Sequence, residues 1–190
     1  MARRRGRSGA DERVAELPGD PEQELGDPEA VARAICLRLL TQRARSRAEL
    51  AAALAKRDVP DDAAKLVLDR FVEVGLIDDA ALAASVAGAQ HHERGLARRA
   101  VAAKLRERGL ADQMDDALSG IDRDSERERA RELVTKRRRA LAGLPSDVQA
   151  RRLVGLLARK GYPAGLAYGV VREALEADQP GWEPAAVLDP

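Results

Sequence analysis

Apolar residues recur along most of this chain at intervals of three and four positions, the period of one face of an α-helix. Val31, Ile35 and Leu39 begin the pattern, and Leu50 and Leu54 resume it after a short break. The pattern predicts an all-α protein. Helices are expected to begin near residues 28, 46 and 78, to run from 146 to a stop at 161, and to cover about 61–74, 96–108, 112–121, 124–141 and 164–177.

Residues with helix-capping chemistry stand at the starts of several of these helices. Asp27 precedes Pro28, and Asp78 precedes a helix bearing Leu82, so both carboxylates are expected to cap free backbone N–H groups. Ser46 and Glu49 have the spacing of a capping box, in which each side chain satisfies a backbone donor of the other residue. The segment 146–149 has the same spacing and predicts a second capping box.

The helices also repeat with a period of about 51 residues. Three segments each place two apolar residues four positions apart, then a basic residue, a turn residue and another apolar residue. The turn residues Asp58, Gly109 and Gly161 are 51 and 52 positions apart, and Gly and Asp both tolerate the left-handed geometry of a helix C-cap. Any helical protein contains leucine pairs and glycine caps, but agreement in register across three copies predicts a triplication. The segments are 50–59, 101–110 and 153–162.

The repeat divides the chain into three three-helix units, over residues 27–77, 78–122 and 123–177. A helix pair cannot bury its apolar face alone, so stacked units are expected to form an elongated, curved helical array that works through an extended surface. Residues 1–26 lack an apolar period and are predicted to be a disordered tail. Residues 178–190 form a Pro-rich tail, in which Trp182 would dock either on the last unit or on a partner.

Composition and motifs exclude most catalytic classes. The single cysteine, Cys36, lies on an apolar stripe and is predicted to be a small buried hydrophobe. His91 and His92 are adjacent, and adjacent helical side chains diverge by about 100°, so a solvated helix end is expected there rather than a metal site. Asp78 and Asp79 are explained by capping. The chain has no phosphate-binding loop or nucleophile elbow. We predict no enzyme activity, no cofactor and no metal.

The chain also lacks the segments that address a protein to membranes. The basic cluster at 3–7 is not followed by an apolar run, so it is not a secretory signal. No segment approaches the roughly 20 apolar residues of a membrane span. A soluble, cytoplasmic and monomeric protein is therefore predicted.

Basic residues gather locally although the net charge is only +1. The run 136–139 has no interleaved acid and predicts contact with DNA phosphates or an acidic surface, because basic side chains displace counterions from nucleic acid. Upstream, arginines at 127–131 alternate with glutamates, so pairing along the helix is the alternative there. The candidate DNA- or partner-binding residues are Arg45, Arg47, Arg98, Arg99, Lys104, Arg106, Arg108, Lys136, Arg137, Arg138, Arg139, Arg151, Arg152, Arg159 and Lys160.

The junction Val74–Ala83, which reads Val-Gly-Leu-Ile-Asp-Asp-Ala-Ala-Leu-Ala, and the segment Arg94–Leu110 downstream resemble the RecX family, bacterial regulators of the RecA recombinase. The resemblance covers about residues 28–176 and all three units. Three departures stand out: Asp58 replaces the usual Gly, Leu82 replaces a common aromatic residue, and residues 1–26 have no counterpart.

The resemblance implies a protein that binds the RecA–DNA filament in its helical groove and suppresses the ATPase and strand-exchange activities of RecA. It implies RecA as a partner, with weak binding to single- or double-stranded DNA. The first alternative is a direct DNA-binding protein, because each tight turn between helices resembles a helix-turn-helix. The second is a helical scaffold, which predicts no change in filament behaviour when residues 136–139 are reversed to Glu. The scarcity of aromatic residues weighs against base stacking.

Overall fold

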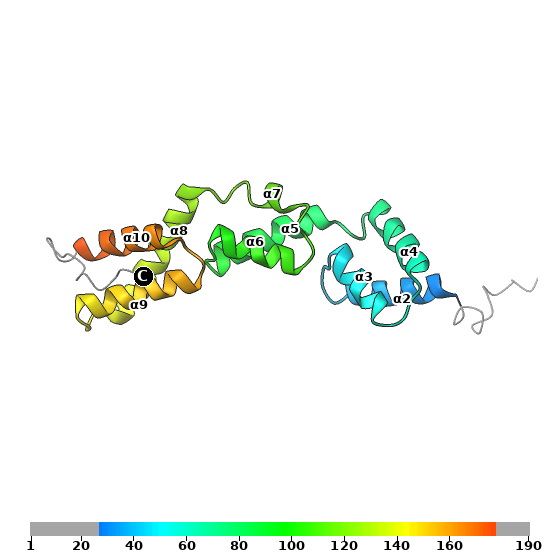
Figure 1. Ribbon diagram of the computed structural model, residues 1–190, viewed down its shortest axis with the longest axis horizontal. Helices are drawn as coiled ribbons and strands as arrows, with labels where there is room; N and C mark the ends of the chain where they lie inside the picture. Colours follow the sequence, from blue (N-terminus) through cyan, green and yellow to red (C-terminus); the bar gives the residue numbers. More distant parts are fainter. Residues whose placement is uncertain (1–26, 178–190) are drawn as a thin grey trace, which may run out of the picture.

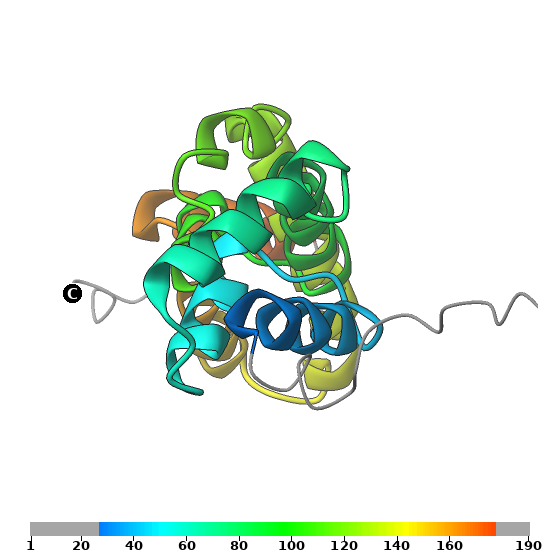
Figure 2. The ribbon, with the colours of Figure 1, turned by 90° about the vertical axis from the view of Figure 1, so that its right-hand side faces the viewer.

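The computed structural model describes residues 27–177, which form an elongated array of helices (Figure 1). Within these residues there are nine α-helices and no strand, which confirms the predicted all-α class. Seen from the end that carries α2 (Pro28–Leu40) and α4 (Asp61–Glu73), the remaining helices lie behind one another along a single axis (Figure 2). The predicted tails, residues 1–26 and 178–190, lie outside the described residues. No helix in 27–177 combines the length and the apolar character that crossing a membrane requires.

The first group of helices comprises α2, α3 (Arg47–Ala55) and α4. The Asp27 carboxylate accepts the Glu29 N–H at 2.9 Å, and the predicted capping box of Ser46 and Glu49 is present at the start of α3. Cys36 is fully buried in the core of this group, as predicted, and burial raises the pKa of its thiol. Cys36 is therefore a packing residue.

The second group comprises α5 (Asp79–Gly88), a π-helical turn (Ala89–Glu93), α6 (Arg98–Glu107) and α7 (Met114–Ala117). The Asp78 carboxylate accepts the Ala81 N–H at 2.8 Å, which confirms its predicted capping role. The predicted helix over 112–121 is wrong, because α7 has only four residues. Gly120 disfavours a helix, and Asp122 must leave helical geometry to accept the Ser125 N–H at 2.8 Å as the cap of α8 (Arg123–Arg138).

The third group comprises α8, a 3₁₀ turn (Arg139–Leu141), α9 (Ser146–Arg159) and α10 (Ala164–Glu176). The helix predicted over 124–141 is therefore α8 followed by the 3₁₀ turn. The predicted capping box at 146–149 is wrong. The Pro145 carbonyl accepts the Gln149 N–H at 3.0 Å, so helical geometry begins one residue earlier, and the Gln149 amide donates to the Leu144 carbonyl at 2.8 Å.

The three turn residues have the same geometry, which confirms the repeat. Asp58, Gly109 and Gly161 have positive φ angles of 56°, 70° and 91°. In each copy the N–H after the turn residue donates to the carbonyl five positions back, at 3.3 Å in the first copy, 3.0 Å in the second and 3.1 Å in the third. The buried side chains form three clusters that follow the three groups, except that Ala97 belongs to the third cluster. The borders between units at 77 and 122 stay a prediction.

Adjacent groups meet end to end, through the end of one helix and the beginning of another. At the first joint the C-terminal turn of α6 meets the beginning of α3, and the Arg108 carbonyl accepts the Ser46 hydroxyl at 2.5 Å. At the second joint the C-terminal turn of α9 meets the beginning of α6, and the Lys160 carbonyl accepts the Ala97 N–H at 3.0 Å. Both joints therefore bring the end of one helix to the beginning of another, but the donor is a side-chain hydroxyl at the first joint and a backbone N–H at the second.

Candidate nucleic-acid interface

The fifteen predicted binding residues fall into two sets by exposure. Only a side chain whose charge is not already used inside the protein is fully available to a phosphate, so the two sets have different consequences. Nine are exposed: Arg99, Lys104, Arg106, Lys136, Arg137, Arg139, Arg151, Arg152 and Arg159. Six are partly buried and contact the protein's own backbone or carboxylates: Arg45, Arg47, Arg98, Arg108, Arg138 and Lys160.

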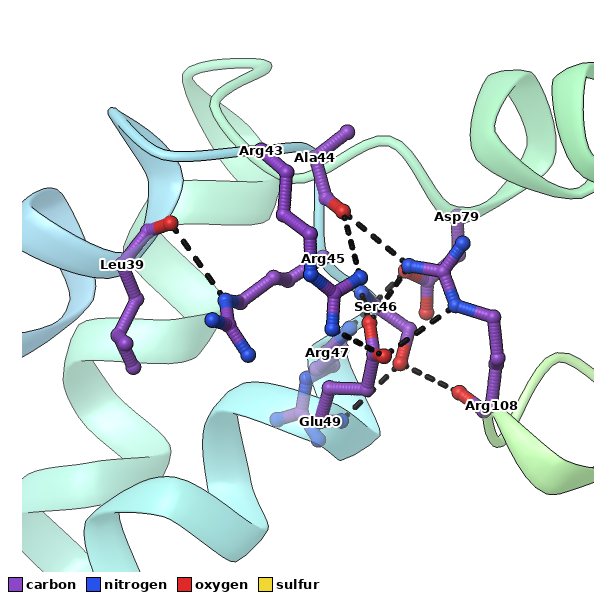
Figure 3. A network of polar contacts seen from close by, with 9 residues as sticks. All are labelled: Leu39, Arg43, Ala44, Arg45, Ser46, Arg47, Glu49, Asp79 and Arg108. Atoms are coloured by element: carbon purple, nitrogen blue, oxygen red, sulfur yellow. Dashed lines mark hydrogen bonds and ion pairs between the residues drawn. The ribbon is translucent and has the colours of Figure 1, made fainter.

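Arg108 belongs to the first joint, where it binds the carboxylate of Glu49 (Figure 3). Glu49 accepts from Arg108 Nη2 at 2.7 Å and Nε at 3.2 Å, from the Ser46 N–H at 3.0 Å and from Arg43 Nη2 at 3.1 Å. Burial opposes the charge of Glu49, but the hydrogen bonds from Arg108, the Ser46 backbone and Arg43 prevail and lower its pKa to about 2. The capping box predicted from the sequence thus also holds the next group of helices.

Arg45 and Arg47 serve the first group and its connection to the second. Arg45 Nε donates to the Leu39 carbonyl at 3.4 Å, and the Arg47 guanidinium binds Asp69 at 2.5 Å. The Arg47 N–H also donates to the Asp79 carboxylate at 3.0 Å, which ties α3 to the start of α5 (Figure 3). Both side chains are therefore used within the fold.

Arg98 and Lys160 serve the second joint and its surroundings. Arg98 Nη1 donates to the Ile121 carbonyl at 2.9 Å and to the Leu118 carbonyl, and Lys160 Nζ donates to the Arg94 carbonyl. Burial and the nearby Arg129 lower the pKa of Lys160. Arg98 thus braces the second group and Lys160 links the third group to the second, so neither offers free charge.

Tyr162 also closes the second joint, a role that sequence reasoning missed. Its hydroxyl donates to the Gly95 carbonyl at 3.2 Å, and burial raises its pKa to about 12. A buried tyrosine with a distant hydrogen-bond partner leaves no periodic signal in the sequence.

Along the long helix α8, arginines of the first half pair with glutamates, whereas exposed basic residues without an ion pair lie near its C-terminal end. Arg127 binds Glu173 on α10, Arg129 binds Glu132, and Arg131 binds Glu173 at 3.1 Å and Glu128 at 3.5 Å. The structure thus shows the pairing alternative for the first half of the basic segment. Lys136 and Arg137 of α8 and Arg139 of the following 3₁₀ turn are exposed and form no ion pair with another residue of 27–177.

The C-terminal part of α8 borders an open hollow of about 650 Å³ between α8 and α9, which we call the arginine groove. Arg137 comes from α8. The other lining residues come from α9 and share one helical face, because they lie three, four, eight and eleven positions after Val148. Leu153 and Leu157, on the other face of α9, are buried in the core. The groove is lined by Arg137, Val148, Arg151, Arg152, Leu156 and Arg159.

The chemistry of the arginine groove favours phosphate over other ligands. Its described lining has four guanidinium groups and no carboxylate. Guanidinium forks bind phosphate oxygens two at a time and keep their charge at all physiological pH values. No aromatic side chain is present in that lining, so it offers no aromatic platform for base stacking, and the guanidinium groups suit the sugar–phosphate backbone.

A second hollow of about 540 Å³ extends the basic surface toward the second joint. It shares Arg137 and Leu156 with the arginine groove and adds Lys136, Arg94 and Lys160. Glu93 and Glu132 also line it, so its charge is partly balanced. The basic surface of the third group is therefore strongest in the arginine groove.

The exposed basic residues of α6 lie outside both hollows. Arg99 and Arg106 are exposed, and Lys104 binds Glu107 at 2.7 Å. Contact of these residues with DNA or a partner stays a prediction.

The histidine pair is not the solvated helix end that was predicted. His91 is buried, and its Nδ1 lies 2.9 Å from the Leu96 carbonyl oxygen, whereas His92 is exposed. The π-helical turn adds one residue to the end of α5 and so directs His91 inward. Among residues 27–177 no three His, Cys, Asp or Glu side chains are arranged to hold a metal ion.

Comparisons with known proteins agree on one family. The model of the first three-helix domain of RecX matches residues 32–71, and the model of its third three-helix domain matches residues 124–171. The chain is 52% identical to the regulatory protein RecX of Streptomyces coelicolor over 161 residues, which is 84% of each chain. It is 53% identical to the regulatory protein RecX of Thermobifida fusca over 150 residues, which is 78% of this chain and 81% of the relative.

Solved structures show the same fold at lower sequence identity. The crystal structure of RecX from Lactobacillus salivarius matches with a TM-score of 0.68 at 17% identity, over 78% of this chain and 97% of that chain. A second crystal structure of a regulatory protein RecX matches with a TM-score of 0.66 at 23% identity, over 83% of this chain and 81% of that chain.

Proposed function

Because the chain belongs to the RecX family of regulatory proteins, we propose that it inhibits the RecA recombinase by binding the groove of the RecA–DNA filament. Binding would suppress the ATPase and strand-exchange activities of RecA and so modulate recombination and repair. The family is one of regulatory proteins and not of enzymes. In a mixture of this protein with RecA and DNA, RecA would therefore be the protein that hydrolyses ATP.

The observation that carries this proposal is the arginine groove, placed on an elongated helical array (Figure 1). A filament on DNA presents regularly spaced phosphates along a helical path. An elongated body with several exposed guanidinium groups can neutralise several of them and release their counterions. An elongated body can also contact more than one filament subunit, which restrains the subunit movements that accompany turnover.

The mechanism assigns different work to the two sets of basic residues. Arg108 holds the first two groups of helices together, and the side chains of Arg45 and Arg47 brace the first group, so their removal would change the shape of the array. Arg137, Arg151, Arg152 and Arg159 would bind phosphate directly. Charge removal in this second set is thus the cleaner test.

The experiment is DNA-stimulated ATP hydrolysis by RecA, with this protein titrated in at moderate salt. Wild-type protein is expected to inhibit at near-stoichiometric amounts. The variant R137Q/R151Q/R159Q is expected to require at least about tenfold more protein, because each lost phosphate contact removes a counterion-release contribution. The matched control K56Q/R57Q/R33Q removes the same charge from exposed positions of the first group and should inhibit like the wild type.

Two outcomes would contradict the proposal. If the groove variant inhibits as well as the wild type, the groove is not the contact surface. If folded, helical wild-type protein does not inhibit at all, the regulator of RecA is the wrong function, and the scaffold alternative gains support.

The direct helix-turn-helix alternative finds less support, because the helices after the tight turns lack free basic side chains. On α4, Lys65 binds Asp69 at 2.6 Å and Arg70 binds Glu73 at 3.0 Å. On α10, Arg172 binds Glu176 at 3.5 Å. A recognition helix needs donors directed at base edges and phosphates. A DNA titration without recombinase separates the readings, since sequence-specific binding would favour this alternative.

A further inference from the structure

The arginine groove concentrates like charge at one place on the protein's own surface. Four guanidinium groups line it, and the described residues supply no carboxylate to balance them. Like charges at short range repel, so an anion bound there relieves that repulsion. A segment of the same chain would do so efficiently, because tethering gives it a high effective concentration.

The chain leaves the described fold beside this surface. Helix α10 packs against both α8 and α9, and its last residue is Glu176. The Ala174 carbonyl accepts a hydrogen bond from Arg138, which follows the groove residue Arg137 on α8. The described part of the chain therefore ends next to the basic end of α8.

The composition of residues 178–190 complements the groove. The segment has three acids, Asp178, Glu183 and Asp189, and no Lys or Arg. It also has Trp182, whose indole suits the two apolar groove residues, Val148 and Leu156. Thirteen extended residues span up to about 43 Å at roughly 3.3 Å each, whereas the groove residues of α9 span only about 17 Å at 1.5 Å per residue.

We propose that residues 178–190 lie in the arginine groove and compete there with phosphate, so that the chain restrains its own binding surface. The acids would pair with the groove arginines, and Trp182 would cover Val148 and Leu156. A phosphate-bearing ligand would have to displace the segment. The contact itself is independent of the function proposed above, and only its regulatory consequence rests on that function.

The other acidic segment of the chain is less suited to the groove. Residues 11–26 carry six acids and one arginine. They precede α2, which lies at the opposite end of the array from α9 (Figure 1). This segment is the competing occupant that the experiment must separate.

Trp182 offers a direct readout, because it is the only tryptophan of the chain. In the full-length protein its emission is expected to be blue-shifted relative to a free peptide of residues 178–190. The shift should be lost in R151Q/R159Q and retained in the matched control R33Q/R57Q. Inorganic tripolyphosphate should reverse it in the wild type and in R33Q/R57Q, and should leave the emission of R151Q/R159Q unchanged.

Affinity for a dye-labelled oligo-dT strand, measured by anisotropy without RecA, tests the competition. The full-length variant D178N/E183Q/D189N is expected to bind about tenfold tighter than the wild type, since about three surface ion pairs compete with phosphate in the wild type. The matched variant D20N/E22Q/E24Q should bind like the wild type.

Several results would overturn the proposal. One is a Trp182 emission equal to that of the free peptide. Another is a blue shift that R151Q/R159Q leaves intact, which would place the segment elsewhere. A third is tighter binding in D20N/E22Q/E24Q alone, which would assign the groove to the N-terminal segment. None of these depends on inhibition of RecA, so failure here and failure of the proposed function are distinguishable.

Discussion

At the scale of single residues, the three equivalent turns differ in what they must accommodate. A Cβ on Gly109 would lie 2.3 Å from the Ala48 Cβ, and one on Gly161 would lie 2.8 Å from the Ala100 Cβ. Both glycines are thus required by positive φ and by close approach of the neighbouring group. Asp58 needs only the positive φ, because within 27–177 no earlier group packs on its turn. This explains why a side chain replaces glycine at the first turn.

We predict that Gly109→Ala lowers the free energy of unfolding by at least about 2 kcal/mol. Left-handed geometry costs an alanine roughly 1–2 kcal/mol, and the overlap with Ala48 must open the first joint. Asp58→Gly should change stability by less than about 1 kcal/mol, because Gly fits the turn but gains entropy in the unfolded chain. Urea unfolding followed by circular dichroism compares the two, and equal effects would contradict the assignment.

At the scale of elements, one helix start performs two tasks. The Ser46–Glu49 capping box satisfies the first turn of α3, and the same carboxylate and hydroxyl hold the end of α6. At the second joint the cap position of α6 is Ala97, which has no side-chain donor, so the backbone N–H takes over the contact with Lys160. The first joint is therefore more polar than the second.

We predict that the first joint weakens in acid. The pKa of Glu49 is lowered from its ordinary 4.5 to about 2 in the folded protein. A lowered pKa means that the stabilisation is present above about pH 4.5 and is lost as the pH falls toward 2. Glu49→Gln should remove about 1–3 kcal/mol at pH 7. Below pH 2 the difference from wild type should vanish, as measured by unfolding at several pH values. A constant difference between pH 7 and 2 would contradict this role.

At the scale of the whole molecule, two unequal joints connect three groups of helices. The first joint depends on Glu49, Arg108 and Arg43, which form ion pairs at its surface. The second joint also has apolar contacts, since Tyr162 is buried and Gly95 lies directly against Leu133. Salt weakens ion pairs by screening them, whereas it does not weaken apolar burial. The two joints should therefore respond differently to ionic strength.

We predict that the first joint loosens at about 1 M salt, where the Debye length falls to about 3 Å. Small-angle scattering should show a larger or broader distribution of dimensions for the wild type at high salt than at low salt. Arg108→Gln should show that distribution already at low salt. Tyr162→Phe, a change at the second joint, should not reproduce it. Identical scattering of wild type and Arg108→Gln at low salt would contradict the prediction.

The candidate site was only partly predictable. All four arginines of the groove were among the predicted residues, because unbalanced basic positions can be recognised along a helix. The sequence could not separate them from Arg98 or Arg108, whose charges are used inside the fold. Their partners lie 20 or more positions away, and no local spacing reports such pairs.

The sequence alone determined the helical class, the threefold repeat and most helix ends, because periodicity, caps and left-handed turns are local properties of the chain. It failed at residues 112–121 and 146–149, where the cap of α8 and the proline before α9 reset the helix boundaries. Tertiary structure decided which charges stay free, since a basic side chain is neutralised only when folding brings a carboxylate or carbonyl to it. It also decided that α8 and α9 face each other across the arginine groove, because that depends on how the helices of the third group pack together.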